Sequence, residues 1–200
     1  MSITIKKYLD PKDYNSVIDF ALDGLHLSDY CQGIDLYLFS RLSVYKELLK
    51  ATRIYSVYEN DKFIGVLLAE IKGEQKKIDS FWMKAFVKGC EILYSILEGP
   101  RGYYEAIKLM YDEYIKINDP YAEILLFVLD PKMKGKGIGT MLLKEFEKDL
   151  KDKEVFLYAD IGCTYQFYEH RGYTKEQEIE YFEDSRGELI KCFLYSKKIK

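Results

Sequence analysis

The stretch Val128-Leu129-Asp130-Pro131-Lys132-Met133-Lys134-Gly135-Lys136-Gly137-Ile138-Gly139-Thr140 decides the fold. It begins at the end of an apolar run that starts at Ile124, typical of a strand covered on both faces. Three alternating glycines then lead into an amphipathic helix predicted from Ile138 to Leu150. Glycines let the main chain approach a ligand with its N–H groups exposed, and a helix N-terminus carries about half a positive charge. With its two lysines, this loop is predicted to bind phosphate. The alternative is a basic turn that only caps the helix.

Two common phosphate-binding motifs fit this loop poorly. The string G-x-x-x-x-G-K-[ST] is absent. A dinucleotide-binding loop needs G-x-G-x-x-G directly after its strand, whereas here the third glycine comes one position early and the glycines follow Pro131. Asp160 does lie about twenty residues further on, where a ribose-binding acid belongs in that fold. A nucleotide-dependent oxidoreductase therefore stays as a third interpretation.

Patterns on either side of the loop predict one mixed α/β (α+β) sheet with helices on both faces. Before the loop we expect a strand, two helices, a hairpin and an inserted helical pair, at residues 2–8, 10–24, 36–50, 53–58, 63–71, 80–97 and 103–114. After it we expect a strand, a short helix and a terminal hairpin, at residues 155–159, 164–170, 178–182 and 189–195. The length of the chain and the order of the expected helices and strands favour a single domain over residues 1–200, with a helical insert at 73–119.

Composition excludes several classes of protein. The 200 residues are 48% hydrophobic and 32% charged, a balance that excludes a disordered tail, a fibre or a disulfide-dense mini-protein. The net charge of -3 argues against nucleic acid as a partner. The apolar runs are too short to span a membrane, and the N-terminus lacks a signal peptide. We therefore expect a cytoplasmic protein.

Four cysteines are spaced too irregularly for a metal site: Cys31, Cys90, Cys163 and Cys192. We expect four reduced, mostly buried thiols and no metal. A cysteine nucleophile would need a histidine base, and His170 follows Cys163 by seven residues. No third residue is placed to orient that histidine, so this stays a minor alternative.

Two motifs in order resemble the GNAT superfamily of acyl-CoA-dependent N-acetyltransferases. Lys134-x-x-Gly137-x-Gly139 is similar to the family's Q/R-x-x-G-x-G/A, with lysine in place of Gln or Arg. Phe167-Tyr168-Glu169-His170-Arg171-Gly172-Tyr173 is similar to its second element, a tyrosine on a short helix before a basic residue and Gly-aromatic. The resemblance covers nearly the whole chain except the insert. It implies a mostly antiparallel, splayed sheet of about seven strands, with the helical insert before the fourth.

The resemblance also implies acetyl-CoA as co-substrate and a set of binding residues. The pyrophosphate would lie on the main-chain N–H groups of Lys134, Gly135, Lys136, Gly137, Ile138, Gly139 and Thr140. The main chain of Val128 and Leu129 would bind the pantetheine arm and the thioester oxygen. The Thr164 hydroxyl would touch the cofactor, although the asparagine frequent in the family near this position is absent here.

The implied reaction is attack of a neutral primary amine on a thioester. An alkylammonium with a pKa near 10.4 needs a base at pH 7. Glu123 has the same offset from the glycine motif as the general base of the histone acetyltransferase branch. A merely solvated Glu123 is the alternative, and Asp130, a tyrosine or a relay water could serve instead. Tyr168 would protonate the leaving sulfur, a modest uphill step from a pKa near 10 to one near 8.5, unless it is a core tyrosine. His170 and Arg171 are expected on the surface.

The insert is rich in aromatic side chains and is predicted to shape the acceptor site or a subunit interface, as in a homodimer. Most are expected only to pack the inserted helices: Phe81, Trp82, Phe86, Tyr94, Tyr103, Tyr104, Tyr111 and Tyr114. Its acids could attract a cationic amine: Glu91, Glu98, Glu105 and Asp112. The acceptor class, a polyamine, amino sugar, amino acid or protein amine, stays open. A non-catalytic sensor or partner-binding domain of the same fold is the main alternative to an enzyme.

Overall fold

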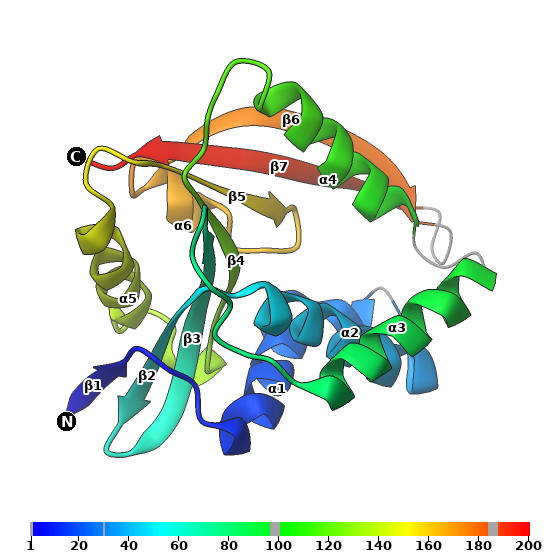
Figure 1. Ribbon diagram of the computed structural model, residues 1–200, viewed down its shortest axis with the longest axis horizontal. Helices are drawn as coiled ribbons and strands as arrows, with labels where there is room; N and C mark the ends of the chain where they lie inside the picture. The colour runs from blue at the N-terminus through cyan, green and yellow to red at the C-terminus, as the bar shows by residue number, and fades with distance from the viewer. Residues whose placement is uncertain (1, 30, 97–100, 184–187) are drawn as a thin grey trace.

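The computed structural model describes residues 2–29, 31–96, 101–183 and 188–200. They form one seven-stranded sheet in the order β1-β2-β3-β4-β5-β7-β6 (Figure 1). The strands are β1 Ile3–Lys6, β2 Arg53–Glu59, β3 Lys62–Ile71, β4 Ala122–Leu129, β5 Glu154–Asp160, β6 Thr174–Glu183 and β7 Glu188–Lys198. Every neighbouring pair is antiparallel except β4 and β5, which are parallel. The mostly antiparallel seven-stranded sheet expected from the sequence is confirmed.

Within the described ranges, six α-helices cover the two faces of this sheet. They are α1 Tyr14–Gly24, α2 Gly33–Lys50, α3 Phe81–Ile96, α4 Arg101–Tyr114, α5 Ile138–Glu147 and α6 Gln166–Glu169. Leu142 and Phe146 of α5 pack on one face, and Phe167 and Tyr168 of α6 join the same apolar cluster. Helices α1, α2 and α3 pack over β2–β4 on the opposite face, and α4 covers β5, β6 and β7 there (Figure 1).

The boundaries of several elements differ from the sequence expectation because local hydrogen bonds set them. Asp10 accepts the Lys12 N–H and caps a short 3-10 turn, so α1 begins only at Tyr14. The terminal hairpin is longer than its alternating core, since cross-strand pairing extends from Thr174 to Lys198. The turn at 184–187 lies outside the described residues.

The insert divides into two helices with different partners. Helix α3 lies on α2, with the rings of Tyr45 and Phe86 5.5 Å apart in an edge-to-face contact. Helix α4 packs on β5 and β7 through the fully buried Met110 and Tyr114. Leu97 and Glu98, and the side chains of Tyr103 and Tyr104, lie outside what the structure describes. Across the described ranges, no helix is long and apolar enough to cross a membrane.

Candidate active site

Strands β4 and β5 separate after a short stretch of parallel pairing. Their pairing runs only from Ala122 opposite Val155 to Ile124 opposite Leu157. Strand β4 nevertheless continues to Leu129 and stays paired with β3 to its end. Beyond Ile124, the main-chain groups on the β5 side of β4 therefore have no strand partner among the described residues, and the sheet opens there (Figure 1).

A β-bulge decides which groups of β4 face this gap. The register passes from Ala69 opposite Ile124 to Leu68 opposite Leu126, so Leu125 has no partner on β3. The Asp130 N–H donates to the Ile64 carbonyl at 2.8 Å, and N–H directions alternate along a strand. The main-chain groups of Val128 therefore point to β3, and those of its neighbours on either side point into the gap.

The groups facing the gap thus belong to Phe127 and Leu129. Both side chains pack against the cluster under α5, whereas Val128 is buried in the cluster under α1 and α2. This geometry keeps Leu129 as a candidate for binding the pantetheine arm and favours Phe127 over Val128. Phe127 is not among the residues that the resemblance implies, which are Val128 and Leu129.

Asp130 caps the short helix that follows β4. Asp130 is 6% exposed, and its carboxylate accepts the Lys132 N–H at 2.9 Å, which fixes the 3-10 turn Pro131–Met133. The ammonium of Lys62 lies 3.8 Å from the same carboxylate. Because Asp130 is engaged in this way at the far end of β4 from Glu123, the structure does not favour it as the base.

The glycine loop presents free N–H groups to one side. Gly135 and Gly137 have φ of +78° and +76°, a conformation that favours glycine. The N–H groups of Lys134 and Lys136 donate to carbonyls of the preceding turn. In the described part of the chain, the first N–H of α5 bonded to the main chain is that of Met141, which donates to Gly137. The N–H groups of Gly135 and residues 137–140 thus remain for a phosphate, a narrower set than the seven residues predicted.

Helix α6 is held against the start of α5. A Cβ on Gly139 would lie 3.1 Å from the Phe167 ring, so glycine permits the close approach. The guanidinium of Arg171 lies 3.6 Å from the centre of that ring and donates to the Phe167 carbonyl and the Thr140 hydroxyl. Arg171 therefore ties α6 to α5, contrary to the expectation of a surface residue, and the Thr140 side chain already has a partner. Thr164 is exposed ahead of α6.

Tyr168 lies at the centre of an aromatic group between α6 and β7. Its ring contacts those of Phe167, Tyr173 and Tyr195 at centroid distances of 5.2, 5.7 and 6.5 Å. Among the described residues, no group forms a hydrogen bond with its hydroxyl. Burial, followed by the charge of Cys163, raises the pKa of Tyr168. The hydroxyl therefore stays protonated and can donate, while full proton transfer to a thiolate is more uphill than the sequence suggested.

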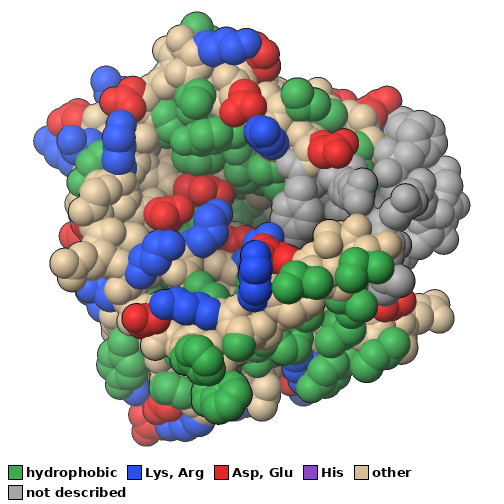
Figure 2. Space-filling model, turned by 45° about the vertical axis from the view of Figure 1, so that its right-hand side comes forward, with side chains coloured by type: hydrophobic (Ala, Val, Ile, Leu, Met, Phe, Trp, Pro, Cys, Tyr) green, Lys and Arg blue, Asp and Glu red, His purple; other side chains and the backbone are tan. Residues whose placement is uncertain are grey.

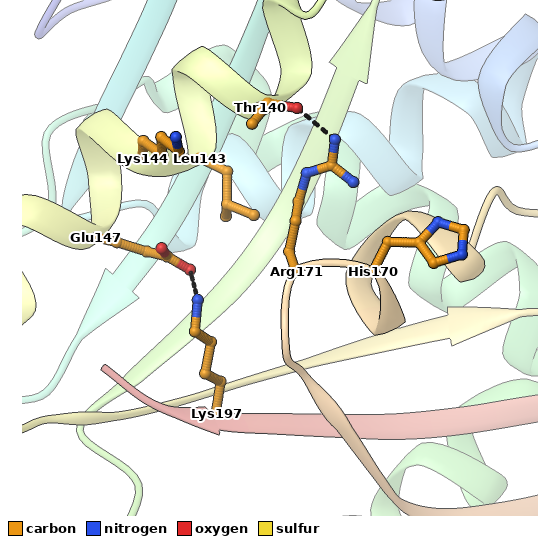
Figure 3. Close-up of a pocket in the computed structure, with 7 residues that line it drawn as sticks. All are labelled: Thr140, Leu143, Lys144, Glu147, His170, Arg171 and Lys197. Carbon is orange, nitrogen blue, oxygen red and sulfur yellow. Dashed lines mark hydrogen bonds and ion pairs between the residues drawn. The ribbon is translucent and has the colours of Figure 1, made fainter. Parts of the chain in front are cut away.

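A groove of about 550 Å³ runs beside the glycine loop (Figure 3). It is lined by Thr140, Leu143, Lys144, Glu147, His170, Arg171 and Lys197. Lys197 pairs with Glu147 at 2.8 Å, and the His170 ring points away from both (Figure 3). Neither Glu123 nor Tyr168, the two residues predicted to be catalytic, lines this groove.

Three carboxylates and one ammonium meet on the opposite face of the sheet. Glu123 on β4 stands opposite Glu70 on β3, and Lys50 on α2 lies 3.9 Å from Glu123 and 3.7 Å from Glu47. Burial raises the pKa of Glu123 to about 7, Glu47 and Glu70 add to this, and Lys50 opposes it. Burial also raises the pKa of Glu47. Glu123 is therefore poised to exchange a proton near neutral pH.

The cluster formed by Glu47, Glu70 and Glu123 faces α4 across the opening of the sheet. Phe156 of β5 is in register with Glu123, so the next outward side chain, Tyr158, lies on the same face. Burial, followed by the charge of Glu123, raises the pKa of Tyr158, and Tyr111 and Asp112 of α4 contribute to it. Figure 2 shows a hollow on this side of the molecule with acidic and basic side chains around it. Among the insert acids, Glu91 is paired with Lys46 at 3.4 Å.

Asp160 and Cys163 shape the turn that follows β5. Asp160 accepts the Cys163 N–H at 3.0 Å and so closes the turn after β5. Burial raises the pKa of Cys163, which leaves little thiolate for nucleophilic attack. Within the described ranges, no three His, Cys, Asp or Glu side chains are placed to hold a metal ion.

Comparison with known proteins places this geometry in a family. The model of the acetyltransferase (GNAT) family matches residues 26–173, well over half of the chain. PaiA N-acetyltransferase from Thermoplasma acidophilum, solved in complex with coenzyme A, is 19% identical with a TM-score of 0.56 over 99% of each chain. PH1933 from Pyrococcus horikoshii OT3 is 20% identical with a TM-score of 0.59, covering 100% of this chain and 99% of that one.

A third solved structure has the same fold. The ribosomal-protein-S18-alanine N-acetyltransferase from Escherichia coli is 12% identical with a TM-score of 0.53, covering 100% of this chain and 95% of that one. At such identities the likeness shows a shared fold alone. No curated protein sequence matches this chain.

Proposed function

Because this chain belongs to the GNAT family of acetyltransferases, we propose that it moves the acetyl group of acetyl-CoA to a primary amine by direct attack on the thioester. The observation that carries the proposal is the gap between β4 and β5. On one face of the sheet the gap adjoins the free N–H groups at the start of α5. On the other it adjoins Glu123, whose pKa lies at about 7. Donor and acceptor can thus meet from opposite faces.

The residues at the start of α5 fit the pyrophosphate of acetyl-CoA. The N–H groups of Gly135 and residues 137–140 have no carbonyl acceptor in the described part of the chain, and the helix N-terminus favours an anion there. The main-chain groups of Phe127 and Leu129 then offer strand-like hydrogen bonds to the amides of the pantetheine arm. A free N–H in this edge also stabilises negative charge that develops on the thioester oxygen.

Glu123 takes the proton from the acceptor amine in this proposal. Deprotonating an alkylammonium at pH 7 costs about 4.6 kcal/mol, so the base contributes substantially to the rate. Phe127 lies four residues beyond Glu123, about 13 Å along an extended strand. We therefore infer that the proton passes through water to the carboxylate. As the amine nitrogen bonds to the carbonyl carbon, the C–S bond breaks and Tyr168 donates its hydrogen bond to the leaving sulfur.

The acceptor is expected to be cationic before it reacts. The carboxylates of Glu47, Glu70 and Glu123 lie around the Lys50 ammonium on the face of the sheet that carries Glu123, where the acceptor is expected to bind. A second ammonium, that of Lys46, acts on Glu47, so the carboxylates outnumber the ammonium groups by three to two. This excess of negative charge in a half-buried place favours an ammonium over a neutral or acidic compound. Size and shape of the acceptor depend on the hollow between α2 and α4.

Two measurements on the purified protein test the proposal. Acetyl-CoA at 100 times its Kd is expected to raise the free energy of unfolding by about 2.7 kcal/mol. Release of free CoA thiol, followed over a panel of a polyamine, an amino sugar, an amino acid and a peptide amine, is expected with at least one acceptor. Stabilisation without turnover on any amine would favour a non-catalytic sensor. Stabilisation by NAD(P) but not by acetyl-CoA would overturn the proposal.

A further inference from the structure

Helix α3 has an apolar face that nothing in the described part of the chain covers. This outer face consists of Phe81, Trp82, Ala85, Gly89, Ile92 and Ile96, which lie on one side of the helix at spacings of three and four residues. Phe81 is 75% exposed, Trp82 80%, Ile92 51% and Ile96 71%. The other side of α3, with Met83 and Phe86, already packs on the body of the protein. Hydrophobic side chains are prominent on the lower part of the face in Figure 2, where α3 runs.

Glycine in the middle of this face has no explanation within one copy of the chain. Gly89 lies in the interior of a 16-residue helix, where glycine is the least favourable residue after proline. A Cβ added there would meet no described residue within 4 Å, so the described part of one copy does not require the small residue. A second helix packed closely across this point would require it, because small residues let two helix backbones approach.

We propose that this chain forms a homodimer in which the outer faces of two α3 helices pack antiparallel about a two-fold axis near Ala85 and Gly89. The face is self-complementary in that arrangement. Its large aromatic residues lie at the N-terminal end, its aliphatic residues at the C-terminal end, and its small residues between them. Reversing one helix sets Trp82 of one copy beside Ile92 of the other and brings the two small centres together, as a two-fold interface requires.

The exposed area agrees with a dimer core. With about 150–250 Å² for each fully exposed aromatic side chain, the outer face presents on the order of 500 Å² of apolar surface. That is at the upper end of the patches found on monomers and most of the roughly 800 Å² that each partner buries in a standard interface. The proposal rests on α3 alone and is independent of the catalytic proposal.

Trp82 makes the test direct, because it is the only tryptophan in the chain. Sedimentation velocity of the full chain between about 1 and 200 µM is expected to show a dimer that dissociates on dilution. The emission of Trp82 is expected to move to shorter wavelength over the same concentrations as the indole leaves water. A protein that stays monomeric at the highest concentration overturns the proposal.

The Gly89→Glu variant tests whether the dimer forms through the outer face of α3 or through another surface. It adds a carboxylate at the centre of the outer face, in open space and at a helical position that favours glutamate over glycine. The variant is expected to fold with an unchanged urea midpoint or better, stay monomeric, and keep long-wavelength Trp82 emission at every concentration. Gly24→Glu, an exposed helical glycine with the same open surroundings on α1, is the matched control and is expected to dimerise.

Three outcomes would assign the face differently. A Gly89→Glu protein that still dimerises, with Trp82 emission that stays at long wavelength, would place the dimer contact elsewhere, and one that dimerises with shifted emission would show that the contact is not centred on Gly89; either result would overturn the proposal. A monomeric wild type whose Trp82 emission shifts only on adding anionic phosphatidylserine vesicles would assign the face to a membrane surface instead.

Discussion

Glu70 and Glu123 stand directly opposite each other on β3 and β4, with their side chains on the same face of the sheet. Like charges in such cross-strand pairs destabilise each other. Glu47 adds a third carboxylate from α2, and Lys50 is 3.9 Å from Glu123. Burial and these carboxylates hold the pKa of Glu123 at about 7 against the opposing charge of Lys50. Residues 47, 50, 70 and 123 thus set the pH at which Glu123 exchanges its proton, and with it the pH dependence of the proposed reaction.

Substitutions in this group are expected to move the pH dependence of the reaction in opposite directions. A base must be ionised to accept a proton, so kcat/KM should rise with pH through the pKa of Glu123, about 7. Lys50→Met removes the group that lowers this pKa and should move the midpoint to higher pH. Glu70→Gln removes one that raises it and should move the midpoint to lower pH. Well below the midpoint, moving it by about one pH unit changes the ionised fraction of the base tenfold.

Lys50→Arg is the control for this series, because it keeps the positive charge and should keep the midpoint. Profiles from pH 5 to 9 with a saturating acetyl-CoA concentration are sufficient. One midpoint shared by all the variants would mean that Glu123 is not the titrating base.

Glu123 should also lower stability at alkaline pH. Its pKa is raised in the folded protein from 4.5 to about 7, so folding favours the protonated form. The protonated form of Glu123 therefore stabilises the folded wild type at low pH, and this part of the free energy of unfolding is lost as pH rises from about 4.5 through 7. Glu123→Gln mimics the protonated form and should match wild type near pH 4.5 but exceed it at pH 8 by on the order of 2 kcal/mol in the free energy of unfolding. Urea titrations at the two pH values measure this, and a difference independent of pH would contradict it.

The sequence predicted what depends on local pattern. A pattern of residues adjacent in the sequence was sufficient to predict three features: the glycines at 135, 137 and 139, the short helix with Tyr168, and the seven strands. The bulge at Leu125 has no such pattern, because apolar residues occupy both faces of β4 at that point. No pattern in the sequence therefore indicated that the main-chain groups of Phe127, rather than those of Val128, face the gap together with those of Leu129.

Long-range contacts account for the rest. Glu47 meets Glu123 only because α2 packs over β3 and β4, and Glu70 meets it only because β3 pairs with β4. In the sequence a glutamate on a helix or strand looks like a solvated residue. Arg171 looked like a surface residue for the same reason: its partners are Phe167 on the preceding turn and Thr140, 31 residues earlier. The contacts of Glu47 with Glu123 and of Arg171 with Thr140 join residues far apart in the sequence, so no motif spacing predicts them.

Tyr168→Phe tests the role of the phenol in the departure of the thiolate. The ring packs among Phe167, Tyr173 and Tyr195, so phenylalanine should fit without a change in fold. Its hydroxyl has no hydrogen bond to the described residues, so little stability should be lost. We expect kcat to fall at least tenfold, with a similar acetyl-CoA Kd by calorimetry. Tyr195→Phe, whose hydroxyl bonds Glu169 at 2.7 Å, is the matched control and should keep kcat. Unchanged turnover in Tyr168→Phe would remove it from the mechanism.

Two substitutions of Gly137 distinguish the effect of charge at the expected phosphate site from the effect of backbone conformation on acetyl-CoA binding. Gly137 has φ of +76°, which asparagine tolerates better than most residues. Gly137→Asn should keep much of the thermal stabilisation by acetyl-CoA, because the N–H groups at the start of α5 stay in place. Gly137→Glu adds a carboxylate beside the expected pyrophosphate and should abolish the stabilisation. Equal stabilisation of the two variants would show that the phosphates bind elsewhere.

Gly65→Ala should disturb the edge of β4 that faces the gap. An added Cβ would lie 2.3 Å from Leu129 Cδ2 and 2.7 Å from the Val128 carbonyl oxygen, and that oxygen belongs to backbone that cannot step aside cheaply. We expect a loss on the order of 2–3 kcal/mol in the free energy of unfolding by urea. Because Leu129 must shift, the stabilisation by acetyl-CoA should fall as well. Gly24→Ala, with nothing within 4 Å of its added Cβ, should be neutral or slightly stabilising and bind acetyl-CoA as wild type does. A Gly65→Ala protein of lower stability but unchanged acetyl-CoA affinity would mean that the Leu129 end of β4 does not contact the cofactor.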